Sequence, residues 1–146
     1  MTRSSFNRET LLHQMSEEAH GVRFYQSLAG MTTDLEQAKQ LEYIGQQEVK
    51  HLQMLMRIWH RLYRSDPSLE VEYTAPNNFL QGVNEALADE IVASEVYRDM
   101  YLDIGDSAIR ESLFDAMTDE TRHGQMLQKM QTDYLMNHTQ SSCKDN

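Results

Sequence analysis

The sequence carries one short pattern of acidic and imidazole side chains twice. EVKHLQML begins at Glu48 and ETRHGQML begins at Glu120, so each unit places a histidine three residues after a glutamate, at His51 and His123. Five of the eight positions are identical, and a sixth exchanges one basic residue for another. Residues three apart on a helix share a face. A carboxylate and an imidazole on one face are typical ligands of a divalent metal ion.

Two further glutamates obey the same spacing. The separation in sequence from Glu48 to Glu120, called here the repeat interval, also separates Glu18 from Glu90. Each of these earlier glutamates precedes the glutamate of its own unit by the same number of positions. Tyr25 and Tyr97 are likewise one repeat interval apart. The chain therefore reads as two helical hairpins of common pattern, whose acidic residues would meet at the centre if the hairpins pack with pseudo-twofold symmetry.

Apolar residues with helical spacing occur in four segments, and a glutamate interrupts each of them. Glu18 lies between Met15 and Val22, Glu48 between Ile44 and Leu52, Glu90 between Leu87 and Tyr97, and Glu120 between Ala116 and Leu127. A stripe of this period faces the interior of a helical protein. We therefore expect four carboxylates and two imidazoles to point inward.

The breaks between the segments predict how the helices connect. GMTTD, from Gly30, and DIGDS, from Asp103, are short joints that would make antiparallel helix pairs. RSDPSLEVEYTAPNN, from Arg64, holds both prolines, and about twelve extended residues reach roughly 40 Å. We predict an all-α antiparallel four-helix bundle over residues 1–138, with one long crossover between helices two and three. Residues 139–146 are expected to form a disordered polar tail.

Composition limits the classes of partner. The net charge of −10 argues against nucleic acid and against an anionic membrane surface. The single cysteine, Cys143, leaves no intramolecular disulfide and no Cys-x-x-Cys site in the sequence. The first residues have no apolar run typical of a signal peptide, and no stretch approaches the ~20 apolar residues of a membrane span. A cytoplasmic location is the expectation.

Four buried carboxylates require compensating charge. Without it they would repel one another and lose their hydration. Two divalent cations cancel four negative charges, and carboxylate with imidazole suits iron, manganese or zinc. We expect Glu48 and Glu120 to bridge two metal ions, Glu18 and Glu90 to be terminal ligands, and each histidine to bind one metal ion.

On these residues the chain resembles the rubrerythrin-related members of the ferritin-like dinuclear metal carboxylate proteins, from about Glu9 to Tyr134. The resemblance implies a ferritin-like bundle holding two iron ions, less often manganese, that perform redox chemistry with hydrogen peroxide or dioxygen. Rubrerythrins also carry a rubredoxin-type domain with paired Cys-x-x-Cys, which this sequence lacks, so an external electron donor is expected. They place another glutamate one turn after the helix-three ligand, where this chain has Ala93, and that makes the ligand set closer to the ferroxidase type.

Three functions stay open at this point. The chain is an oxidoreductase, a ferroxidase or iron-handling protein, or a metal-stabilised bundle without turnover, and a homodimer or higher homo-oligomer is expected for it. Tyr25 and Tyr97 are either hydrogen-bond donors to the site or ordinary core aromatic residues. The remaining expectations concern residues outside the site: a solvated face for Glu17 and His20, surface positions for His13, His60 and His138, and an interface at Trp59 and Tyr63.

Overall fold

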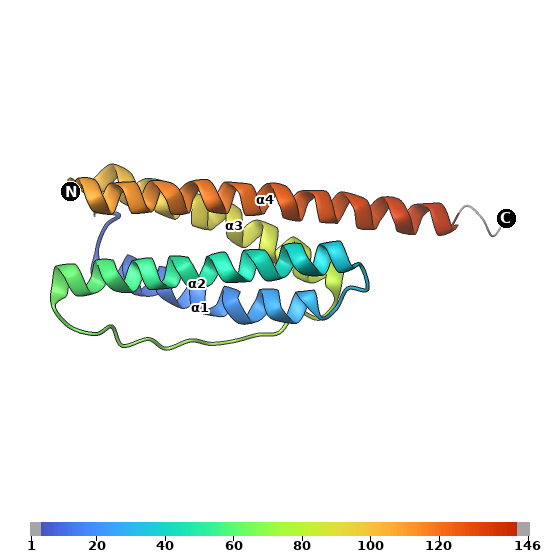
Figure 1. The fold of residues 1–146 in the computed structure, drawn as a ribbon, viewed down its shortest axis with the longest axis horizontal. Coiled ribbons are helices and arrows are strands. Elements are labelled where there is room, and N and C mark those ends of the chain that lie inside the picture. Colours follow the sequence, from blue (N-terminus) through green and yellow to red (C-terminus); the bar gives the residue numbers. More distant parts are fainter. Residues whose placement is uncertain (1–3, 143–146) are drawn as a thin grey trace.

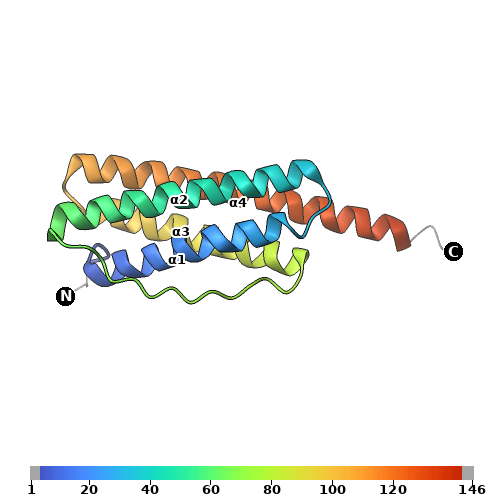
Figure 2. The same ribbon diagram turned by 60° about the horizontal axis from the view of Figure 1, so that its bottom comes forward.

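The computed structural model describes residues 4–142, which form four helices and no strand. The helices are α1 (Arg8–Ala29), α2 (Leu35–Tyr63), α3 (Phe79–Asp103) and α4 (Ser107–Ser142). α1 lies antiparallel to α2, and α3 lies antiparallel to α4 (Figure 1). The two hairpins pack so that α2 faces α4 and α1 faces α3 (Figure 2). The predicted ferritin-like bundle with one long crossover is confirmed.

Polar side chains at the helix starts define where the helices begin. Asp34 accepts hydrogen bonds from the backbone N–H groups of Glu36 and Gln37, at 2.9 and 3.1 Å. Asp106, one repeat interval later, accepts from the N–H groups of Ala108 and Ile109, at 3.0 and 3.1 Å. Such caps satisfy N–H groups that have no partner within the helix. The two hairpins therefore use the same signal at corresponding positions.

The crossover between α2 and α3 runs along α1 and covers it (Figure 2). The guanidinium of Arg23 lies over the ring of Tyr73, 4.0 Å from its centroid. The hydroxyl of Ser16 donates to the backbone carbonyl of Glu70 at 3.2 Å. The acidic segment before α3 thus has a structural role, which is to cover the outer side of the first helix.

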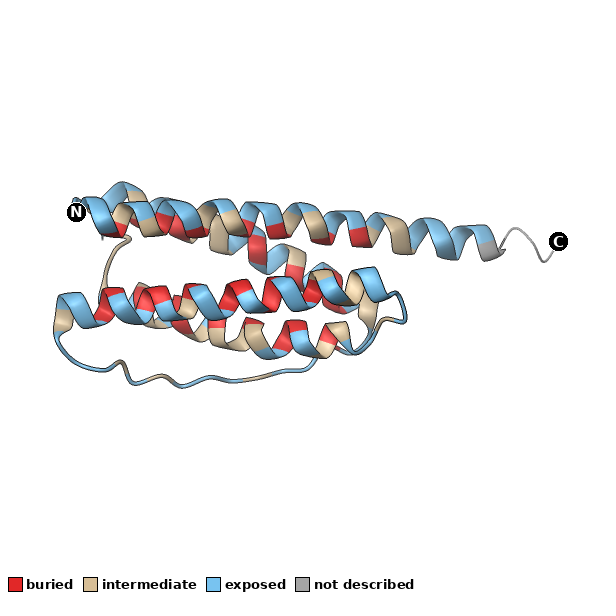
Figure 3. Cartoon of the chain, in the orientation of Figure 1, coloured by how far each residue is buried: buried red, intermediate tan, exposed pale blue. Residues whose placement is uncertain are grey.

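Buried residues lie along the inner sides of the four helices (Figure 3), and they form three successive layers along the bundle. Two are apolar. The Trp59 layer contains Leu11, Met15, Met54, Leu55, Ile58, Trp59, Tyr97, Met100, Ile109, Leu113 and Ala116. The Phe24 layer contains Phe24, Tyr25, Leu28, Leu41, Ile44, Val83, Ala86, Leu127 and Met130. Between them lies an acidic layer made of Glu18, Glu48, His51, Glu90, Glu120 and His123.

The expected interface at Trp59 and Tyr63 is wrong for Trp59, which is only 6% exposed within its own chain. Its ring packs against Tyr63 with the centroids 4.7 Å apart. Arg8 lies over the Tyr63 ring, 4.2 Å from the centroid. The first helix therefore covers the aromatic pair, because Arg8 at its start reaches across to the end of α2.

The expected disorder from residue 139 is wrong as far as Ser142, since α4 continues to that residue. The helix projects beyond the rest of the bundle (Figure 1), where Leu135 and Met136 are exposed. No proline or glycine follows Gly124 in the sequence, and extending an existing helix fixes one residue for each new hydrogen bond. A polar composition alone therefore does not end it. Residues 143–146, including Cys143, lie outside the described part.

Candidate metal centre

The six predicted site residues come together at the centre of the bundle, and all are buried. Their exposed fractions are 1% for Glu18, 5% for Glu48, 4% for His51, 3% for Glu90, 2% for Glu120 and 1% for His123. They form two groups in which the candidate ligand atoms lie within 4.8 Å of one another: Glu18, Glu48, His51 and Glu120, and Glu48, Glu90, Glu120 and His123. Glu48 and Glu120 belong to both groups, so their carboxylates lie within reach of both positions.

Each of the six side chains has a buried atom without a hydrogen-bond partner. These atoms are Glu18 Oε2, Glu48 Oε1, His51 Nδ1, Glu90 Oε2, Glu120 Oε1 and His123 Nδ1. An unsatisfied buried polar atom costs about 1–3 kcal/mol, and more when it is charged. Six such atoms that converge in two groups are therefore suited to two cations, and the donor types fit iron or manganese.

The carboxylates strongly perturb one another's protonation. Burial, followed by repulsion from the neighbouring carboxylates, raises the pKa of Glu48 well above its ordinary value. Burial and contact with Glu90 likewise raise the pKa of Glu120. Burial acts in the same direction on Glu90, but its contacts with Glu120 and His123 outweigh it and lower the pKa. Without metal, the centre therefore retains protons on some of its carboxyl groups.

Burial and the neighbouring carboxylates also have opposing effects on the pKa of His51. Burial lowers the pKa of its imidazole, but the adjacent carboxylates of Glu120 and Glu18 outweigh burial and raise it to about 11. Its Nδ1 lies 2.6 Å from Oε1 of Glu120 and 3.6 Å from Oε2 of Glu18. A metal-free centre at neutral pH thus contains an imidazolium, whose proton a bound metal ion would displace.

The two tyrosines each donate a hydrogen bond to a carboxylate of the other hairpin. Tyr97 donates from its hydroxyl to Oε1 of Glu18 at 2.6 Å, and Tyr25 donates to Oε1 of Glu90. Burial, followed by the neighbouring carboxylates, raises the pKa of both hydroxyls, so both stay protonated. Both interpretations of the tyrosines therefore apply. Their rings are core residues, and their hydroxyls donate hydrogen bonds to the site.

Sequence reasoning missed two polar side chains that contact the acidic layer. Gln14 donates from Nε2 to Oε1 of Glu18 at 2.9 Å. Asp119 places Oδ2 3.1 Å from Nε2 of His51. Gln14 lies one turn before Glu18 on the same face, which was a usable signal. Asp119 had none, because its contact crosses from α4 to α2.

Gly21 leaves room for a carboxylate of the site. A Cβ atom at this position would lie 2.7 Å from Oε2 of Glu48, closer than such atoms approach in proteins. An alanine there would therefore displace the Glu48 carboxylate. The corresponding residue of the second hairpin is Ala93, so this position is occupied by a small side chain in both hairpins.

A cavity of about 110 Å³ joins the acidic layer to the surface between α1 and α3. Its lining includes buried Glu48 and Glu120 and reaches exposed Glu17, Asp89 and Val92. Lost hydration, followed by repulsion from Glu17, raises the pKa of Asp89 to about 6. The volume holds several molecules of the size of water.

The other histidines lie outside the two ligand groups. His13, His60 and His138 are exposed, as expected. His20 is half-buried rather than solvated, since its ring packs 5.4 Å from Phe24 and 5.5 Å from Tyr73 of the crossover.

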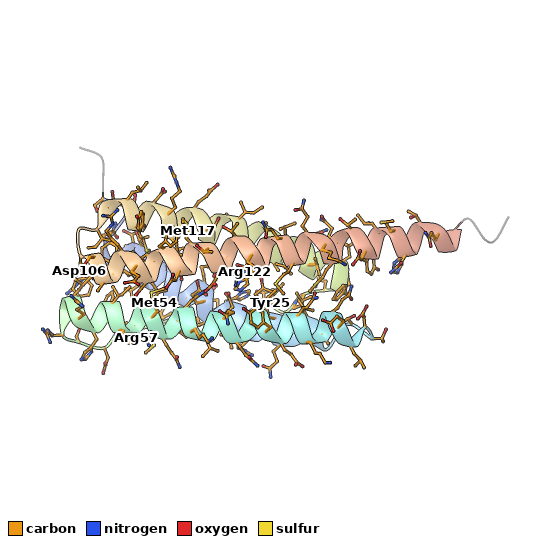
Figure 4. The ribbon with its side chains drawn as sticks, turned by 45° about the horizontal axis from the view of Figure 1, so that its top comes forward. Tyr25, Met54, Arg57, Asp106, Met117 and Arg122 are labelled. Carbon is orange, nitrogen blue, oxygen red and sulfur yellow. The ribbon has the colours of Figure 1, made fainter. Side chains whose placement is uncertain are left out.

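Figure 4 labels Met54 and Tyr25, which belong to the two apolar layers on either side of the site.

A four-helix bundle with one long crossover defines the ferritin-like fold, and its buried carboxylates and histidines define a dinuclear type of metal site. The family model for rubrerythrin matches residues 9–131 of the chain. The chain therefore belongs to the rubrerythrin family.

Two solved structures share the fold at low sequence identity. A hypothetical protein from Pyrococcus furiosus is 16% identical, with a TM-score of 0.78 over 93% of this chain and 94% of its own. A dodecameric thioferritin from Bacteroides fragilis, related to bacterioferritin, is 19% identical, with a TM-score of 0.75 over 97% and 93%. No curated protein sequence matches. Within residues 4–142, no helix is long and apolar enough to cross a membrane.

Proposed function

We propose that the chain is a di-iron protein whose centre performs redox chemistry with hydrogen peroxide or dioxygen. The observation that supports it best is the set of six buried ligand atoms that make no hydrogen bond and converge in two groups that share Glu48 and Glu120. Glu48 and Glu120, which belong to both groups, would contribute to holding both metal ions, and Glu18 with His51 and Glu90 with His123 would each complete one position. Membership in the rubrerythrin family supports the choice of iron over zinc.

When bound, two ferrous ions supply the two electrons that, with two protons, reduce hydrogen peroxide to two molecules of water. The protein holds the ligands in place. Tyr25 and Tyr97 fix one oxygen of each terminal carboxylate and leave the other free. The apolar layers on both sides close the two ends of the centre to bulk water and hold the ligand side chains in position. An external donor must return the electrons between turnovers.

The cavity between α1 and α3 supports a small oxidant as the substrate. It reaches the shared carboxylates, and its volume of about 110 Å³ excludes large organic substrates from the centre. Its wall is partly apolar, through Phe24, Val92 and Val96. Neutral peroxide and dioxygen can enter such a passage without a charge penalty.

Metal stoichiometry after anaerobic reconstitution with ferrous iron tests the proposal. We expect two iron ions per chain after desalting. Mixing the reduced protein with peroxide or with dioxygen, and following the ferric absorbance, then identifies the preferred oxidant. Failure of iron and manganese to bind would remove the redox function, and binding without oxidation by either oxidant would leave a metal-stabilised bundle.

Ferroxidase or iron-handling activity is the second candidate. Ala93 leaves four glutamates and two histidines as the ligand set, and one structure with the same fold is a dodecameric thioferritin. A large assembly that retains many iron ions per chain would support this alternative. Light scattering combined with iron analysis after aerobic loading distinguishes it from a homodimer that holds two. In either case we propose that the chain forms a homo-oligomer.

A further inference from the structure

The two ligand groups are related by the repeat interval, but the side chains around them are not. Glu18 and His51 belong to the first group, and Glu90 and His123 occupy the same places in the second. If the surroundings obeyed the repeat, the two metal positions would be equivalent. They differ at two buried or half-buried places that contact a ligand directly.

The first difference lies behind the histidines. Nε2 of His51, on the side away from the cluster, faces Oδ2 of Asp119 at 3.1 Å. The residue that corresponds to Asp119 in the first hairpin is Gln47, a neutral amide that is 8% exposed. In the described part of the chain, the carboxylates paired with His123 all face its Nδ1. Only the first position therefore has a carboxylate behind its imidazole.

The second difference lies at the terminal carboxylates. Oε1 of Glu18 accepts two hydrogen bonds, from Gln14 at 2.9 Å and from Tyr97 at 2.6 Å. Oε1 of Glu90 accepts from Tyr25, and the place corresponding to Gln14 is taken by Ala86, which has no polar side chain. Glu18 is therefore held more firmly with its free oxygen, Oε2, toward the cluster.

We infer that the two metal positions are unequal, and that Asp119 and Gln14 make the Glu18–His51 position the tighter one. This inference rests on the proposed dinuclear function. With a metal ion on Nδ1, Nε2 of His51 would carry the ring's remaining proton and donate a hydrogen bond to Oδ2 of Asp119. A carboxylate in that place fixes the ring and makes Nδ1 a stronger donor, and loss of such a partner lowers metal affinity by roughly 10–100-fold. Gln14 is neutral and only orients the Glu18 carboxylate, so it contributes less to metal affinity than Asp119 does.

Arg122 completes the arrangement on the outer side. Its guanidinium lies 3.9 Å from Oδ1 of Asp119, which leaves Oδ2 for His51. Arg122 is more than half exposed, so this ion pair is weak by itself. Asp119 is a positioning residue, since it acts through His51 and does not reach the cluster.

Anaerobic titration of the metal-free protein with cobalt(II), followed by visible absorbance and calorimetry, tests the inference. We expect two successive binding steps in the unaltered chain. Asp119→Asn should weaken the first step about 10–100-fold and leave the second unchanged, so that the two steps merge. Gln14→Ala should weaken the first step by only a few-fold. Asp115→Asn, an exposed position one turn earlier on α4, makes the same change of charge and should alter neither step.

Three results would overturn the inference: equal affinities in the unaltered chain, a first step that Asp119→Asn does not change, or equal weakening of both steps. Circular dichroism melting of the variants verifies that they are folded. A chain that binds fewer than two cobalt ions contradicts the dinuclear proposal itself. Two ions bound with equal affinity contradict only the inequality.

Discussion

The acidic layer and the two apolar layers beside it have opposite effects on the bundle. The Trp59 and Phe24 layers bury aliphatic and aromatic side chains, whose removal from water stabilises the fold by about 1.5–3 kcal/mol for each large residue. The acidic layer buries four carboxylates and leaves six polar atoms without a hydrogen bond. The apolar layers therefore offset the free-energy cost of burying the acidic layer. Bound cations would lower that cost, and this favours metal binding at the centre.

The largest effect is expected from removing a shared carboxylate. Glu48→Ala should reduce the bound metal from two ions per chain to none, because Glu48 belongs to both ligand groups. Glu18→Ala should leave one ion. Elemental analysis after desalting measures both, with Glu95→Ala at an exposed position of α3 as the control that keeps two. One remaining ion in Glu48→Ala would make Glu48 a terminal ligand.

A cavity in an apolar layer should instead affect folding. Leu55→Ala, at a fully buried position of the Trp59 layer, should lower the free energy of unfolding by about 2–5 kcal/mol. Urea denaturation of the metal-free protein measures the loss. The folded variant should still bind two metal ions, since Leu55 is not in the acidic layer. Loss of metal binding by a folded Leu55→Ala would show that the layers are not separable.

The stability of the metal-free protein should depend on pH, because the buried groups of the acidic layer have shifted pKa values. The pKa values of Glu48 and Glu120 are raised, and that of His51 is raised to about 11, so the native state binds more protons than the unfolded chain. Their contribution to stability is complete below the ordinary pKa values and is lost as the pH rises through the native ones. The lowered pKa of Glu90 acts oppositely, but below its ordinary value of 4.5.

We therefore expect the free energy of unfolding to fall by about 2 kcal/mol between pH 6 and pH 8 from His51 alone, because the native imidazole keeps its proton over this range while that of the unfolded chain loses it. Urea denaturation at the two pH values measures the change. Metal-loaded protein should show the opposite trend, because metal ions compete with protons for the same atoms. A metal-free protein that is more stable at pH 8 would contradict the assignment of these protons.

The smallest effects are expected from the tyrosine hydroxyls, and they should be unequal. Tyr25→Phe removes a donor to Glu90 and should weaken metal binding about 10-fold. Tyr97→Phe should weaken it only about 3-fold, because Gln14 still holds the same oxygen of Glu18. Cobalt titration measures both. Equal losses would mean that Gln14 does not orient Glu18.

Periodicity and repeat spacing alone predicted the helices and the six residues of the acidic layer. This worked because a ligand that must face the interior occupies the same stripe as the apolar residues of its helix. The repeat interval then set aside Glu17 and His20, because their counterparts in the second hairpin are Asp89 and Val92 and do not repeat the pair. The helix starts at Asp34 and Asp106 were predictable for a similar reason, since a cap is a local interaction.

Only the tertiary structure decided which side chains meet across helices. The contact of Asp119 with His51, the packing of His20 under Tyr73 and the cover that Arg8 provides over Tyr63 depend on how far each helix is rotated and shifted against its neighbours. The period of a single helix does not contain that information. The length of α4 also escaped prediction, because its polar end has no residue that stops a helix already held by the bundle.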